Sequence, residues 1–89
     1  MKNKEDIIEY LGLDYENKKE KWWKPTIKIA MEIEKEYSKE IENGKYGYGL
    51  TCYFENTVTR NFLEDPKEYN LIKIKDYDGY ITLYEKVAK

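Results

Sequence analysis

The chain has 89 residues, of which 40% are apolar and 38% are charged, and its formal net charge is −2. These values predict one small soluble domain with a single core, and they exclude a disordered chain. With no histidine, one cysteine and one arginine, the sequence lacks the side chain on which most acid–base and nucleophilic catalysis at neutral pH depends. We therefore expect a protein that binds rather than an enzyme, and one without a cofactor.

Cysteine usage and hydropathy indicate the compartment. A lone cysteine cannot form an intramolecular disulfide, and no stretch has the length of a transmembrane span or the pattern of a signal peptide. We expect a cytoplasmic protein with no membrane partner. The strong preference for lysine over arginine, together with abundant isoleucine, asparagine and tyrosine, is typical of an AT-rich genome, such as that of a low-GC bacterium or one of its phages.

Two helices are predicted in the first half of the chain. The first covers residues 3–11, with Asn3 as its N-cap and Gly12 as its stop. The second covers residues 25–43, because one apolar face recurs at helical spacing and Pro25 suits a first helical turn. A short helix does not persist alone, so the first must dock through its apolar stripe. That stripe consists of Ile7, Ile8 and Leu11.

An alternating pattern follows and predicts a half-buried strand at residues 46–54. Cys52 lies on the apolar face of that strand, where a thiol behaves as a small hydrophobic group, so we expect it in the core. Residues 57–63 fit two alternatives. Their β-branched content favours another strand, whereas Asn56 would also suit the N-cap of a short helix.

The clearest signal is a C-terminal hairpin, with strands at residues 71–75 and 80–87 around an Asp-Tyr-Asp-Gly turn. Its buried face would carry Ile72, Ile74, Ile81, Leu83 and Val87. The turn lacks the remaining ligands of a calcium loop, so we expect no metal site. The elements predict an α+β fold in a single domain over residues 1–89: two N-terminal helices packed on a three- or four-stranded antiparallel sheet.

Adjacent tryptophans precede the second helix. Trp22 and Trp23 cannot both point inward from neighbouring positions at a helix start. In one interpretation Trp23 caps the core and Trp22 covers its edge. In the other, an exposed ring anchors an interface, where tryptophan and tyrosine often dominate the binding energy.

The outward face of the hairpin combines rings with cations. Its residues are Lys73, Lys75, Tyr80, Tyr84 and Lys86, with Tyr53 and Arg60 as further candidates. Single-stranded nucleic-acid platforms use this arrangement, because rings stack on bases and cations meet phosphates. The alternative is an ordinary solvent-facing strand, in which tyrosine and lysine are common. Rings gathered on one lysine-rimmed face would favour nucleic acid, whereas rings dispersed around the helices would favour a protein partner.

The favoured hypothesis is a non-catalytic protein-binding module that inhibits or modulates a larger protein or nucleoprotein complex. Small size, missing catalytic residues, abundant aromatic rings and near-neutral charge favour it. Phage-encoded antagonists of bacterial defence, such as anti-CRISPR proteins, have this profile, as do immunity proteins and antitoxins. The alternative is a single-stranded nucleic-acid-binding module that uses the tyrosine and lysine face. A third route is pairing through a sheet edge, which leaves both a monomer and a homodimer open.

Overall fold

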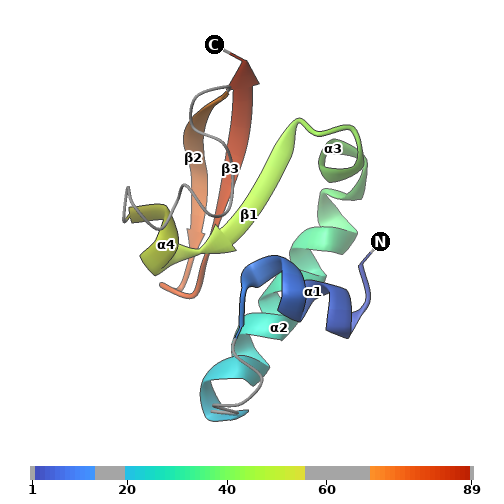
Figure 1. Cartoon of the computed structure of the whole chain (residues 1–89), viewed down its shortest axis with the longest axis vertical. Helices are drawn as coiled ribbons and strands as arrows, with labels where there is room; N and C mark the ends of the chain where they lie inside the picture. Colours follow the sequence, from blue (N-terminus) through green and yellow to red (C-terminus); the bar gives the residue numbers. More distant parts are fainter. Residues whose placement is uncertain (1, 14–19, 56–68, 89) are drawn as a thin grey trace.

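The computed structural model describes residues 2–13, 20–55 and 69–88 (Figure 1). The elements in chain order are the helices α1 (Lys4–Leu11), α2 (Glu20–Glu36) and α3 (Ser38–Glu42), the strand β1 (Tyr46–Leu50), the helix α4 (Thr51–Glu55), and the strands β2 (Tyr69–Tyr77) and β3 (Ile81–Ala88). The predicted α+β class and its antiparallel sheet, here three-stranded, are confirmed. The element predicted at 57–63 lies outside the described residues.

The first helix forms as its caps predict. The Asn3 side chain accepts a hydrogen bond of 2.9 Å from the Asp6 N–H, and Gly12 ends the helix with a left-handed φ of 71°. These contacts satisfy backbone groups that have no partner inside the helix. The stripe of Ile7, Ile8 and Leu11 is buried, so α1 docks on the core as expected.

The helix predicted at 25–43 differs from the observed one at its start and near its end. It begins at Glu20, so Pro25 lies inside α2 instead of in its first turn. A proline removes one backbone hydrogen bond, a loss that is smallest near a helix N-terminus. The helix is also interrupted at Tyr37, where φ is −116° and ψ is 27°, and it resumes as α3. Gly44 follows α3 and has a left-handed φ of 80°.

The strand predicted at 46–54 ends at Leu50, and this prediction was wrong beyond that residue. β1 pairs with β3 only up to the pair Leu50 and Ile81, because Ile81 is the first residue of β3. With no partner left to pair, the chain turns into α4. Thr51 fixes this junction, since its N–H donates to the Tyr80 carbonyl at 3.1 Å. Cys52 is consequently exposed on α4 and does not lie in the core.

The C-terminal hairpin closes through a tight turn at Asp78 and Gly79. Both residues have positive φ, 54° and 78°, as a type I′ turn requires, and the Tyr80 N–H donates to the Tyr77 carbonyl at 2.9 Å. The Asp76 carboxylate accepts the Gly79 N–H at 3.0 Å, which holds the turn from the strand side. β2 is longer than the predicted strand at 71–75, and β3 is shifted by one residue from the predicted 80–87, but the hairpin itself is confirmed.

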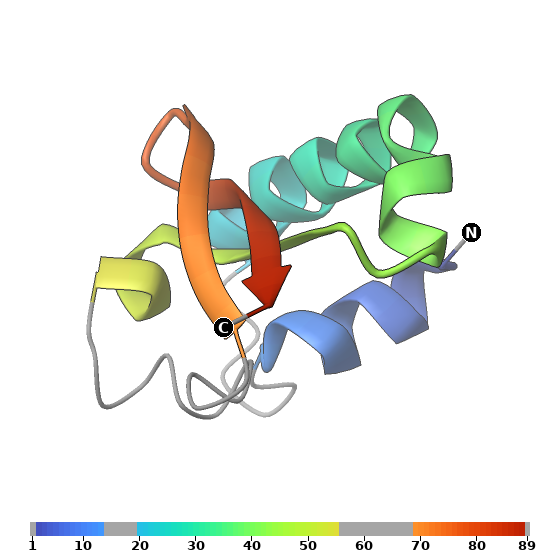
Figure 2. The ribbon, with the colours of Figure 1, turned by 90° about the horizontal axis from the view of Figure 1, so that it is seen from above.

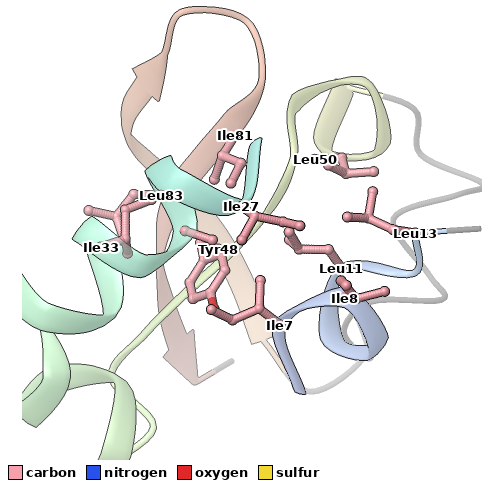
Figure 3. Packing of buried hydrophobic residues seen from close by; sticks show 11 residues of the cluster. Ile7, Ile8, Leu11, Leu13, Ile27, Ile33, Tyr48, Leu50, Ile81 and Leu83 are labelled. Carbon is pink, nitrogen blue, oxygen red and sulfur yellow. The ribbon is translucent and has the colours of Figure 1, made fainter. Parts of the chain in front are cut away.

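The sheet order is β1-β3-β2, so the last strand of the chain is the central strand. Helices α1 and α2 contribute to one apolar cluster together with β1 and β3 (Figures 2 and 3). Its members include Ile7, Leu11, Ile27, Ile33, Tyr48, Leu50, Ile81 and Leu83. No residue of β2 belongs to the buried part of this cluster. The helices therefore shield β1 and β3, whereas β2 is held mainly by its pairing with β3.

Candidate functional site

The strand β2 is an edge of the sheet and exposes most of its side chains. Only Tyr69, Leu71 and Tyr77 are half-buried, and the other residues of the strand are exposed. Ile72 keeps 52% of its surface exposed and Ile74 keeps 44%. The prediction that these isoleucines are buried with Ile81 and Leu83 was therefore wrong, although the pairing of Ile72 with Glu85 places it on the face of Leu83. In β3, Ile81 and Leu83 are buried as predicted, but Val87 is only half-buried, and Thr82, predicted to face outward, is buried. No helix among the described residues buries the corresponding part of β2.

A register shift at Ile74 separates the two lysines of this strand. Lys73 pairs with Tyr84 and Lys75 pairs with Leu83, so Ile74 is an extra residue without a partner in β3. Directly paired residues lie on the same face of an antiparallel sheet, and neighbouring residues of β3 lie on opposite faces. Lys73 is therefore on the face away from the helices and Lys75 is on the helix face. The expected common face for these two lysines was wrong because of this bulge.

On the helix face, Lys75 and two tyrosines meet the end of α2. The Lys75 Nζ lies 4.6 Å from the centre of the Tyr77 ring, a cation–π contact. Burial raises the pKa of Tyr77 to about 12, and the neighbouring Tyr37 and Glu36 add to the rise. Tyr37 in turn packs against Tyr46 of β1, with 5.7 Å between the ring centres. These rings lie between helix and sheet, which sequence alternation alone did not show.

On the opposite face, Tyr84 is only 1% exposed, so its predicted place on an open surface was wrong. The Phe54 ring of α4 stacks on it with 5.6 Å between the ring centres and 23° between the planes. Gly47, the cross-strand partner of Tyr84, has no side chain, and a Cβ there would meet the Tyr84 ring at 2.8 Å. Because glycine leaves the room and α4 supplies a cover, the ring is enclosed where the alternation predicted solvent exposure.

The remaining predicted binding residues are scattered. Tyr80 and Trp23 are half-buried and pack against the core cluster. Lys86 is half-buried, with its Nζ 5.9 Å from the centre of the Tyr69 ring. The structure thus brings Lys73 and Lys86 onto one face but does not gather the rings and cations into a single platform. The side chains of Trp22 and Tyr53 and the whole of Arg60 lie outside the described part of the chain, so their roles stay predictions.

The described residues contain neither a cluster of metal ligands nor a helix that could span a membrane. In these ranges no group of three or more histidine, cysteine, aspartate or glutamate side chains could hold a metal. The Asp76 carboxylate already accepts two hydrogen bonds, one from the Gly79 N–H in the turn and one, at 3.3 Å, from the Thr51 hydroxyl of α4. None of the helices in the described ranges combines the length and the apolar character that crossing a bilayer requires.

Comparison with known proteins gives no assignment: no family model, no curated protein and no solved structure matches the chain significantly.

Proposed function

We propose that the protein is a non-catalytic binding module that inhibits or modulates a larger protein or nucleoprotein complex. The observation that carries the proposal is β2, a nine-residue edge strand whose Ile72 and Ile74 are exposed. Exposed apolar side chains on an edge strand are a liability for an isolated domain, and binding a partner protein relieves it. The cytoplasm is the compartment we propose.

The distribution of the rings supports a protein partner over nucleic acid. The tyrosines of the described residues are dispersed. Tyr10 packs on Tyr48 between α1 and β1 with 4.9 Å between ring centres, Tyr37 packs on Tyr46 near the start of β1, and Tyr84 is enclosed. Stacking of successive bases needs open rings that follow one another along a charged groove. The single-stranded nucleic-acid alternative has less support from this arrangement.

Affinity capture with two matched baits tests the proposal. The baits are the wild-type chain and an Ile72→Thr/Ile74→Thr variant, in which β-branched residues keep the strand propensity while the apolar surface is lost. From a nuclease-treated lysate of a low-GC bacterium, we expect the wild-type chain to retain a protein in stoichiometric amount and the variant to lose it. Far-UV circular dichroism checks that the variant is folded.

Two results would contradict the proposal. The first is that no lysate protein is retained in stoichiometric amount by the wild-type chain. The second is salt-sensitive quenching of the tyrosine and tryptophan emission by short single-stranded DNA or RNA at micromolar concentration, which would promote the nucleic-acid alternative.

A further inference from the structure

We infer that the outer edge of β2, which is unpaired among the described residues, accepts an extended strand of the partner protein, with an acidic residue placed opposite Lys73 between two apolar residues placed opposite Ile72 and Ile74. This inference rests on the proposed function and specifies the chemistry of the partner. Strand addition is a recurring mode of recognition in which backbone hydrogen bonds supply affinity and side-chain contacts supply specificity.

The first step is that β2 offers a backbone to pair with. β3 occupies one side of β2, and no other strand pairs with β2 among the residues that the structure describes. The strand is nine residues long and is exposed over most of its length, including the run from Ile72 to Asp76. Its outer backbone groups therefore form a template for one more strand.

The second step is that the lysines make a second copy a poor occupant. In an antiparallel pair of β2 strands, placing Ile74 opposite Ile72 covers both exposed isoleucines but sets Lys73 opposite its own copy. Like charges directly opposite each other destabilise a sheet, so this register incurs that cost. Placing Ile72 opposite Ile72, or Ile74 opposite Ile74, brings only one of the two isoleucines against an isoleucine. The bulge at Ile74 further impedes regular pairing of two such edges.

The third step is that the same charge selects an acidic partner. Lys73 is exposed and has no ion pair or ring contact among the described residues, whereas Lys75 already lies over the Tyr77 ring. An acidic residue opposite Lys73 would gain a favourable cross-strand pair, and apolar neighbours on either side would cover Ile72 and Ile74. The complementary pattern is apolar, acidic, apolar in three successive residues of an extended segment.

The test is nuclear magnetic resonance titration of the isotopically labelled full chain with two capped heptapeptides. One has the sequence Thr-Val-Glu-Val-Glu-Val-Thr, and the other carries lysine in place of both glutamates. We expect the acidic peptide to shift the amide signals of residues 69–77 in a saturable way. The basic peptide should bind about tenfold more weakly, since reversing one cross-strand charge pair is worth roughly 1–1.4 kcal/mol.

Charge-reversal variants supply the matched controls. Lys73→Glu should invert the preference, so that the basic peptide binds about tenfold better than the acidic one. Lys35→Glu makes the same charge change on the exposed side of α2, and it should leave the preference of the wild-type chain unchanged. Because the two peptides are also compared on the unaltered protein, the test does not depend on the folding of any variant.

Three outcomes would overturn the inference: no shift of the residue 69–77 signals at millimolar peptide, equal binding of both peptides, or concentration-dependent shifts of these signals without peptide, which would mark self-pairing. These outcomes are separable from failure of the proposed function. A lysate protein that both the wild-type chain and the Ile72→Thr/Ile74→Thr variant retain would uphold a binding function through another surface and refute the edge as its site. Specific binding of the acidic peptide without any captured protein would uphold the edge and refute the proposed function.

Discussion

Replacing Tyr48 by phenylalanine should make the protein more stable. Tyr48 is 1% exposed, and its hydroxyl has no hydrogen-bond partner among the residues that the structure describes. Burial raises the pKa of this hydroxyl well above its ordinary value, and the nearby Glu34 carboxylate raises it further. The same carboxylate interacts with Lys2, whose Nζ lies at 3.4 Å and whose backbone N lies at 3.5 Å. The hydroxyl is therefore buried near a carboxylate but without a hydrogen bond of good geometry.

The expected change in unfolding free energy follows from two opposing contributions, the relief of a buried polar group and the cost of a small void. A buried polar group without a partner costs about 1–3 kcal/mol. Removing the oxygen leaves a void of roughly 12 Å³, about the space of one small probe, which costs roughly 0.3 kcal/mol at about 24 cal/mol per Å³. The ring itself stays in place, beside Ile7 (Figure 3), and it keeps its contact with the Tyr10 ring. We expect the Tyr48→Phe variant to gain about 1 kcal/mol of unfolding free energy, which for a domain of this size raises Tm by about 4–8 °C.

The assay is urea and thermal unfolding followed by far-UV circular dichroism. The urea midpoint should rise while the slope stays constant, because the surface exposed on unfolding does not change. Tyr46→Phe is the matched control, since it removes the hydroxyl of a half-buried tyrosine of the same strand and should change stability by less than about 0.5 kcal/mol. A loss of 1 kcal/mol or more in Tyr48→Phe would refute the reasoning, because it would mean that the hydroxyl makes a stabilising hydrogen bond.

Three further predictions concern the sheet. Gly47→Ala should lower the unfolding free energy by about 1–3 kcal/mol, because its Cβ would lie 2.8 Å from the enclosed Tyr84 ring. If this clash is the cause, the Gly47→Ala/Tyr84→Leu double variant should be as stable in urea unfolding as the Tyr84→Leu single variant. Gly79→Ala should cost about 1–2 kcal/mol because the new side chain would adopt φ of 78°, whereas Asp78→Gly should be tolerated in the same measurement. Tyr77 binds its proton more tightly in the folded state, so its contribution to stability is complete below pH 10 and is lost as the pH rises towards 12. Between these pH values the unfolding free energy of the Tyr77→Phe variant should therefore fall less than that of the wild-type chain. An identical fall in both proteins would contradict the assignment.

Local chemistry explains which parts of the fold could be predicted from the sequence. The α1 boundaries follow from Asn3 and Gly12, whose side chain and backbone act on the helix ends directly. The final hairpin follows from Asp78 and Gly79, which tolerate the positive φ that the turn requires. Each of these signals involves residues only a few positions apart, so no knowledge of the tertiary fold is needed.

The wrong predictions concern strand lengths and side-chain burial, which depend on elements distant in the sequence. The alternation in residues 46–54 continues past Leu50, but pairing stops there because β3 begins at Ile81. The faces of β2 were assigned by strict alternation, which the bulge at Ile74 breaks. Whether Ile72 is buried depends on how far the helices reach across the sheet, and its own sequence neighbours do not contain that information.

The candidate site was only partly predictable for the same reason. The sequence correctly marked Lys73 as an outward residue, but it marked Tyr84 with equal strength, and the two have opposite environments. Tyr84 is enclosed by Gly47 and Phe54, which come from different elements. The exposed Ile72 gives no sequence signal that distinguishes it from a core residue. A candidate binding surface that consists of an uncovered apolar strand is therefore visible only once the covering elements are placed.

The chemistry of β2 also explains how such an edge is tolerated without a partner. An exposed apolar edge strand invites aggregation, and lysine side chains and bulges are the devices that oppose it. β2 has both, with Lys73 and Lys75 on opposite faces around the bulge at Ile74. A flat, neutral edge would pair with any extended chain, including its own copies. Lys73 disfavours the register in which β2 would cover both isoleucines with its own copy, and in the proposed complex the same charge favours a strand with an acidic residue opposite it. Protection against self-association and selectivity for an acidic partner would then arise from one side chain.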